Sequence, residues 1–255
     1  TTGVQNVILG ALAGDALTDA DRNAAFGYGA LTLDVLGSRS TAIGAITLAN
    51  QNFTTATESY NTAVGYAAGQ EVTTGIQNTI IGGLAGDALT TGSNNTVVGR
   101  DALGADTLGS RAVAIGDAAL QSQNFTTATE NYNVGIGYAA GANLTTSQSS
   151  TLVGGLAGDA ITTGSENTAL GYKTLSANTT GFYNVAVGSR ALANMNVTDS
   201  SSTFNTAVGY NAGNDITTGI SNTIIGGRAG DALTDADFNV AVGMDALTAD
   251  TLGSK

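Results

Sequence analysis

The sequence predicts an all-β protein, a parallel β-solenoid of about 14 coils, and three observations lead to this fold class. A nine-residue phrase such as NTAVGYAAG, which begins at Asn61, returns along the whole chain at fixed intervals. A bulky apolar residue precedes the glycine of every copy. The chain has 36 glycines and no proline, histidine, cysteine or tryptophan. A fixed period of this kind is typical of a solenoid, in which each repeat stacks on the previous one.

The repeat is measured from the glycine that closes NTAVG, called here the motif glycine. The interval between successive motif glycines is either short, 17 positions, or long, 21 positions. Three short intervals and one long interval make a super-repeat of four coils, so equivalent residues differ by 72 in number, as Gly10 and Gly82 do. We therefore expect a single repetitive β-roll shaft segment over residues 1–255, a fragment of a longer fibre protein. The motif glycines are Gly10, Gly27, Gly44, Gly65, Gly82, Gly99, Gly116, Gly137, Gly154, Gly171, Gly188, Gly209, Gly226 and Gly243.

A short strand is expected to end just before each motif glycine. The last residue of this strand, such as Val64, is always bulky and apolar, so we assign its side chain to the core. By strand alternation the preceding residue faces the other way, yet it is also apolar, as in Ala63, Ile80 and Val97. β-Branched residues favour strands, and a strand that is apolar on both faces is covered on both sides. We expect parallel strands, one or two per coil, with coils about 4.8 Å apart.

Two further positions of the repeat have a structural interpretation. An Asn stands four residues before most motif glycines, as at Asn61, and stacked Asn side chains would satisfy the backbone groups of a corner. The motif glycine is expected to need a positive φ or to lack room for a Cβ atom. The Gly-rich GGLAGDAL is not followed by Lys-Ser or Lys-Thr, so no phosphate-binding loop is predicted.

The composition excludes several function classes. Without histidine and cysteine there is no imidazole acid–base group, thiol nucleophile, Cys/His zinc site or disulfide. The formal net charge of −12 argues against nucleic acid and anionic membranes as partners. No apolar run reaches the roughly 18 residues of a membrane span, so no membrane insertion is expected in this segment. We therefore predict no enzyme activity, catalytic residue, cofactor or metal.

Self-association is expected because one coil cannot be stable alone. Burying one Val or Ile contributes about 1.5–3 kcal/mol, whereas ordering each backbone residue costs about 1–2 kcal/mol. Small residues between the core positions would let other chains approach closely. We therefore expect an intertwined or side-by-side parallel homotrimer that buries the face of Ala63, Ala186 and Ala207.

The phrase NTAVGYxAG resembles the head repeats of trimeric autotransporter adhesins, the YadA-type left-handed parallel β-roll. It is also similar to the NTAVGYNAG and TTGSNNT arrays of phage tail fibres, and the resemblance covers Asn6 to Gly253. It implies three parallel chains that form a stiff rod without catalytic residues. The coils are longer than in adhesin heads, and no neck or heptad coiled coil is present, which favours a phage fibre. The expected function is an extracellular shaft segment of a host-attachment appendage, on a virion tail fibre or a bacterial surface.

Each long coil places its extra residues in one polar loop that contains and ends with an apolar or aromatic residue: ANQNFTTATESY, QSQNFTTATENY and ANMNVTDSSSTF. Loops on a rigid scaffold often carry binding, so these loops are candidate contacts with a host cell-surface glycan or protein. The alternative is that the loops only widen or brace the rod. The candidate contact residues are Asn52, Phe53, Tyr60, Asn124, Phe125, Tyr132, Asn196 and Phe204. Asn52, Asn124 and Asn196 also begin N-x-T triplets, for which glycosylation is not favoured.

Other candidates are weighed against structural explanations. Asp15, Asp19 and Asp21, with their copies Asp231, Asp235 and Asp237, could bind Ca²⁺, but solvated corner carboxylates are favoured because no calcium-loop spacing is present. Tyr66, Tyr138 and Tyr210 share one coil position, and packing against adjacent coils is favoured over a sugar platform. Pairs such as Thr90-Thr91 suggest an ice-binding solenoid, but the long loops interrupt this column. A glycan-cleaving solenoid enzyme would need one unique carboxylate pair, whereas these acids recur.

Overall fold

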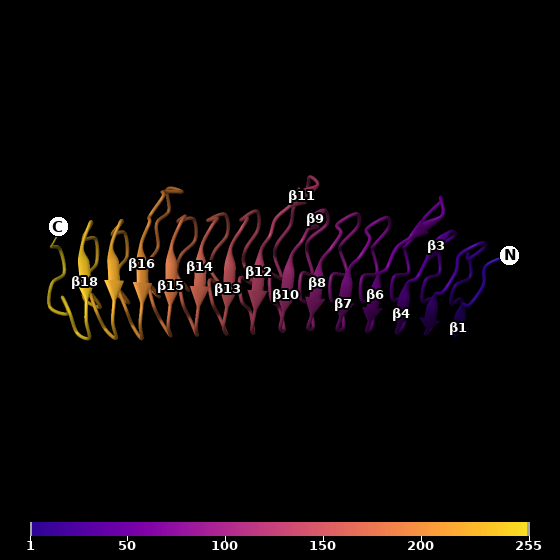
Figure 1. Cartoon of the computed structure of the whole chain (residues 1–255), viewed down its shortest axis with the longest axis horizontal. Coiled ribbons are helices and arrows are strands. Elements are labelled where there is room, and N and C mark those ends of the chain that lie inside the picture. Colours follow the sequence, from indigo (N-terminus) through magenta and orange to yellow (C-terminus); the bar gives the residue numbers. More distant parts are fainter. Residues whose placement is uncertain (1, 254–255) are drawn as a thin grey trace. The chain divides into compact units, whose positions relative to one another are not determined.

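The computed structural model describes residues 2–253, and these residues form strands and turns without any helix. The predicted all-β fold, a parallel solenoid of about 14 turns, is confirmed. The chain divides into two compact units, Thr1–Asn131 and Tyr132–Lys255, and each unit contains one motif strand per coil. Figure 1 shows how, within each unit, a coil returns to lay its strand beside that of the coil before it.

In the first unit the motif strands pair in parallel, without a shift in register, in the order β1-β2-β4-β6-β7-β8-β10. Two-residue strands add a second ladder at each long coil, β3 with β5 and β9 with β11. The strands are β1 Val7–Leu9, β2 Ala24–Phe26, β3 Gly37–Ser38, β4 Thr41–Ile43, β5 Thr57–Glu58, β6 Thr62–Val64, β7 Thr79–Ile81, β8 Thr96–Val98, β9 Gly109–Ser110, β10 Val113–Ile115 and β11 Thr129–Glu130.

The second unit repeats this arrangement with seven parallel motif strands among its described residues. Where the first unit has a second ladder of two-residue strands, the third coil of this unit has an isolated parallel bridge between Phe182 and Ser202. The strands are β12 Val134–Ile136, β13 Thr151–Val153, β14 Thr168–Leu170, β15 Val185–Val187, β16 Thr206–Val208, β17 Thr223–Ile225 and β18 Val240–Val242.

The strand faces are the reverse of our sequence assignment. Ala63, Ala186 and Ala207 are fully buried in the core, so they cannot form the trimer face that we expected. The residues on either side of each buried position face outward, as Thr62 and Val64 do on β6. The alternation itself was predicted correctly. The error arose because we gave the interior to the bulkier residue of the strand, whereas the middle position is buried whether it holds an alanine, as in these three coils, or a large residue such as Ile80 or Leu152. The turns supply the rest of the core.

Two coil types supply this bulk. In one, here called the Gly-type coil, a glycine stands four residues after the motif glycine and an aliphatic residue stands three residues later, as with Gly158 and Ile161. In the Leu-type coil, a Leu takes the first position, and a polar residue takes the second in all of these coils except that of Met195, as with Leu103 and Asp106. A Cβ atom on Gly158 would lie 2.8 Å from Ile161 Cδ1, so the two side chains compete for one volume. Two Gly-type coils alternate with two Leu-type coils, which accounts for the super-repeat of four coils.

Buried asparagines form a hydrogen-bonded ladder along the corner before the strands, as the sequence predicted. Asn78 Nδ2 donates to the carbonyl oxygen of Gly92 over 2.9 Å, and Asn78 Oδ1 accepts from the backbone N–H of Asn95 over 3.0 Å. Asn61, Asn205 and other motif asparagines make the same two contacts. Each side chain therefore ties its own coil together and joins it to the next.

The motif glycines occupy a backbone region that other residues avoid, because all of them have φ between 121° and 141°. They also stack closely: a Cβ atom on Gly82 would lie 2.4 Å from the carbonyl oxygen of Gly99. Three other positions in every coil carry a positive φ as well, and most of these residues are not glycine. One is the residue just before the motif Asn, for example Tyr60 with φ 49° and Gln77 with φ 59°.

Candidate functional site

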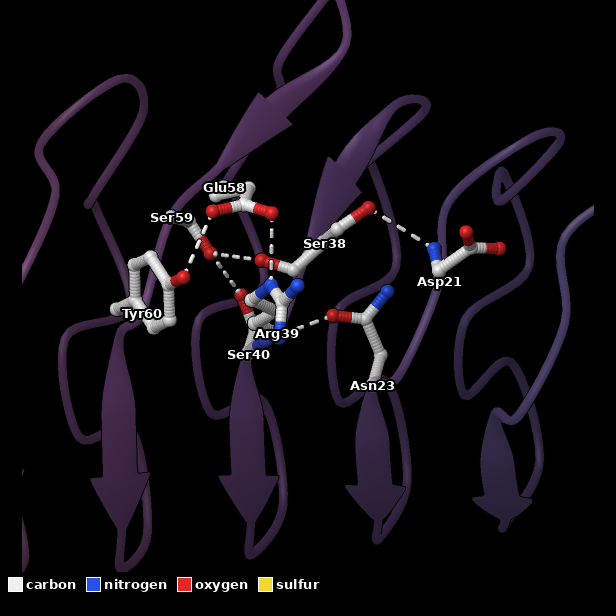
Figure 2. Close-up of polar contacts among 8 residues, drawn as sticks. All are labelled: Asp21, Asn23, Ser38, Arg39, Ser40, Glu58, Ser59 and Tyr60. Carbon is white, nitrogen blue, oxygen red and sulfur yellow. Dashed lines mark hydrogen bonds and ion pairs between the residues drawn. The ribbon is translucent and has the colours of Figure 1, made fainter.

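The base of the first long loop carries an exposed ionic and aromatic cluster, which Figure 2 shows in detail. Arg39 Nε donates to Glu58 Oε1 over 2.9 Å, and the Tyr60 hydroxyl donates to Glu58 Oε2 over 2.7 Å. The Arg39 guanidinium also lies 5.5 Å from the centre of the Tyr60 ring, a cation–π contact. The ion pair is repeated in the second long loop, where Arg111 pairs with Glu130 over 2.9 Å.

The hydrogen bond to Glu58 changes two pKa values in opposite directions. The Tyr60 hydroxyl, followed by Arg39, lowers the pKa of Glu58 below its usual value because both stabilise the carboxylate. The same hydrogen bond raises the pKa of the Tyr60 phenol, since it favours the protonated form. Neither group is poised to transfer a proton near neutral pH. The cluster therefore presents an ion pair and a ring face to solvent, and its arrangement suits binding rather than acid–base chemistry.

A buried polar network lies beneath this cluster. Ser40 and Ser59 share a hydrogen bond of 2.5 Å between their hydroxyls, and Ser59 Oγ donates to the carbonyl oxygen of Ser38 over 2.9 Å (Figure 2). The backbone N–H of Ser40 donates to Asn23 Oδ1 over 2.8 Å, which continues the asparagine ladder. Serine thus substitutes for asparagine here, and its shorter side chain leaves space for a residue from the long loop.

That residue is Gln51, which with Asp34 forms a fully buried clamp on the first long loop. Gln51 Nε2 donates to Asp34 Oδ2 over 2.6 Å. Asp34 Oδ1 accepts from the backbone N–H groups of Gly37 and Phe53, each over 3.1 Å. Gln51 Oε1 accepts from Asn61 Nδ2 over 2.9 Å, so the clamp links the loop to the asparagine ladder.

The second long loop has the same clamp, in which Gln123 Nε2 donates to Asp106 Oδ2 over 2.6 Å. Burial raises the pKa of Asp106 although its hydrogen-bond donors oppose this shift. Neither clamp was predicted from the sequence. The signal available was the recurrence of this Asp and Gln at equivalent positions of two super-repeats, together with their paired replacement by Asn178 and Met195 in the third copy.

The third long loop differs from the other two at its base. Asn178 Oδ1 still accepts from the backbone N–H of Gly181 over 2.9 Å, but Met195 takes the place of the clamp glutamine. Tyr183 and Phe204 replace the Arg and Tyr of the cluster, and their rings stack with centroids 5.1 Å apart and planes 6° from parallel. The same corner of the fold therefore accepts either an ionic or an aromatic pair.

The predicted contact residues fall into two groups. Phe53 and Phe125 are buried, with 5% and 4% of their surface exposed, so their rings brace the loops and do not face a receptor. Tyr60, Tyr132 and Phe204 are about half exposed, at 47%, 53% and 55%. Of the three asparagines, Asn52 is exposed, whereas Asn124 and Asn196 are half-buried.

Tyr66, Tyr138 and Tyr210 do not pack between coils as we expected, because 61%, 63% and 56% of their surfaces are exposed. Each of these tyrosines directly follows a motif glycine, just after the end of a strand. A second aromatic residue, also half-exposed, stands just before the start of the same strand. Most of the exposed large apolar side chains lie either at the outward strand positions or at these two flanking positions. The strand side of the solenoid is therefore its most apolar surface, here called the strand face.

The remaining candidates have structural contacts. Thr73, Thr90, Thr162 and Thr217 each donate a hydroxyl to the backbone carbonyl of the next coil, so this threonine column serves to link coils. Asp21 Oδ1 accepts from the backbone N–H of Val4 over 2.7 Å. Within residues 2–253, no group of three or more acidic side chains is placed to hold a metal ion.

Shallow grooves flank the long loops. One groove, about 410 Å³, lies beside the third loop and is lined by residues such as Asp199, Ser201, Thr218 and Asp235. A groove of about 330 Å³ lies beside the Arg39–Glu58 pair of the first loop. Both grooves are open, and most of the residues that line them are polar, which suits weak contact with a surface more than enclosure of a substrate.

No protein-family model, curated protein or solved structure matches this chain. The described part of the chain also contains no helix that is long and apolar enough to cross a membrane.

Proposed function

We propose that this chain is a structural shaft segment of an extracellular surface-recognition appendage, a phage tail fibre that takes part in host attachment. The observation that carries this proposal is the solenoid itself, in which coils are joined to their neighbours by strand pairing, the asparagine ladder and stacked glycines. A solenoid of this kind is suited to span distance. The resemblance of its repeat to fibre and adhesin arrays supports a role in a surface appendage.

The shaft is a parallel homotrimer in this proposal. The exposed apolar strand face supports association, since a solitary chain would leave Ile81, Leu170 and Ile225 about 40% exposed to water. The net charge of −12 keeps assembled fibres soluble. No membrane, nucleic acid or cofactor is part of the proposed role.

An ice-binding role has less support. An ice-binding surface needs a flat and regular array of free hydroxyls, whereas the hydroxyls of Thr73, Thr90 and Thr162 are donated to neighbouring coils. A trimeric autotransporter head would use the same solenoid. The longer coils of this chain are the reason that we favour the phage fibre.

The test removes the exposed part of each long loop from the parent particle. Residues 54–57, and their equivalents at 126–129 and 198–201, are deleted so that each long coil becomes as short as the others, which also removes one residue each from the short strands β5 and β11. The clamps at Asp34 and Asp106 are kept, and loop length contributes little to closure entropy, so the shaft should retain its β-content. We expect the trimmed particle to attach less well to its host. If attachment is unchanged, the loops are not contacts and this segment acts as shaft only. If the trimmed chain does not fold, the loops are braces.

A further inference from the structure

Three strands are bracketed by exposed aromatic residues at both ends, and each follows a long loop. These strands, here called the bracketed strands, are β6 with Tyr60 and Tyr66, β12 with Tyr132 and Tyr138, and β16 with Phe204 and Tyr210. The six rings are 47% to 63% exposed. Each bracketed strand therefore presents two rings with an outward polar or β-branched pair between them, such as Thr62 and Val64 on β6.

The fold does not need aromatic residues at these positions. Gln77, Ser149 and Ser221 occupy the place of Tyr60 in other coils, with the same positive φ of 56° to 59°. Gly83, Gly155 and Gly227 occupy the place of Tyr66 in other coils. The backbone at these positions is thus the same with or without an aromatic side chain, so the exposed rings are not needed to shape the coil and are available to a contact outside the chain.

We propose that the three bracketed strands are contacts between parallel copies of this chain that lie in the same register. This inference rests on the proposed function, since it names the residues through which copies of the shaft meet. It also replaces the alanine face that the sequence suggested with the opposite face of the same strands.

The spacing of the bracketed strands favours a second copy as the partner. Within the second unit, β12 and β16 are one super-repeat of four coils apart, so two parallel copies without a stagger match both strands, whereas a pair shifted by one super-repeat matches only one. Such simultaneous contacts reinforce one another by multivalency.

Charge and area agree with this partner. Copies with a net charge of −12 repel, so they need a contact free of unpaired charge, and the Arg39 cation beside Tyr60 is neutralised by Glu58. Aromatic side chains bury about 150–250 Å² each, so six half-exposed rings would supply roughly 600 Å² per copy. Specific interfaces bury about 800 Å² per partner, which the neighbouring outward Val and Ile side chains would complete.

The first test replaces the tyrosines that follow the motif glycines. We expect the variant Tyr66→Ser, Tyr138→Ser, Tyr210→Ser to keep its circular dichroism spectrum and to associate at least tenfold more weakly in light scattering. The matched control is Leu33→Ser with Leu252→Ser, two exposed apolar residues outside the strand face, and it should associate as the unchanged chain does. A tyrosine variant that keeps the full assembled mass would overturn the inference.

The second test reads the register, which is simple because the chain has no cysteine. Thr62→Cys places one thiol on the outward side of β6, and a short bismaleimide should link two such chains within the assembly. In a mixture of Thr62→Cys chains and Val134→Cys chains, each position should link to itself and not to the other. Links between positions 62 and 134 would show a stagger of one super-repeat, and an assembled chain without links would show another interface; either result would overturn the inference.

These outcomes separate the two proposals. An unchanged chain that is monomeric at all concentrations would contradict both the trimeric shaft and the bracketed contacts. If the tyrosine variant keeps the assembled mass and the Thr62→Cys chains form no link to each other, only the bracketed contacts are contradicted.

Discussion

Removing one rung of the asparagine ladder should weaken the solenoid by a large and calculable amount. In Asn78→Ala, the carbonyl oxygen of Gly92 and the backbone N–H of Asn95 both lose their partner within a buried corner. An orphaned buried polar group costs about 1–3 kcal/mol, so the variant should lose about 2–6 kcal/mol of stability. Ala112 already occupies one ladder position, which indicates that a chain with a second gap will still fold.

The assay is urea unfolding followed by circular dichroism, together with hydrogen exchange at the Asn95 amide. We expect a lower urea midpoint and faster exchange at Asn95, because this amide loses its acceptor. Asn52→Ala is the control, since Asn52 is exposed, and its effect should stay within about 0.5 kcal/mol. If the two variants unfold alike and the Asn95 amide stays protected, the ladder does not stabilise the coils.

Three other predictions follow from the packing. Gly82→Val should lower the melting temperature clearly, because its Cβ atom would lie 2.4 Å from the Gly99 carbonyl oxygen, and an unchanged melting temperature would contradict the stacking of motif glycines. Asp106→Asn with Gln123→Met, which copies the third loop, should stabilise the chain at pH 7 by about 1 kcal/mol or more, because a buried charge is removed. The folded-state pKa of Asp106 is raised, so this carboxyl favours folding most below its unfolded pKa of about 3.9 and loses that contribution as pH rises through the folded pKa. The gain in thermal melts should therefore vanish towards acid pH, and a gain that is equal at all pH values would refute it. Gly158→Leu should destabilise by about 1–3 kcal/mol through overpacking, and adding Ile161→Thr should recover part of the loss. Equal melting of the single and double variants would show that the two sites do not share one volume.

The period, the fold class and the role of the motif asparagine could be predicted from the sequence, because the same residue type returns at the same position in coil after coil. A strand of three residues such as Thr62–Val64 is too short to reveal its buried face when all three positions are compatible with a core. The decisive information lay in the turns, where a residue such as Leu48 or Leu192 fills the interior of coils whose buried strand residue is only an alanine, Ala42 or Ala186.

The clamps show a second limit of prediction from one sequence. Asp34 and Gln51 stand in different coils and look like solvated polar residues, yet both are fully buried. Only the stacking of adjacent coils brings them within 2.6 Å. The sequence does show that both residues are replaced together, by Asn178 and Met195, in the third copy. The contact between the two side chains explains why they change together.

The mass of the folded chain in solution tests the central claim most directly. We predict a parallel trimer of about 75 kDa from chains of 25.2 kDa, with the strand face covered. Multi-angle light scattering of the well-folded chain across a range of concentrations measures this mass. A value near three times the mass of one chain would agree with a shaft assembled from copies. A folded species that remains at 25.2 kDa would contradict it and leave a single-chain solenoid.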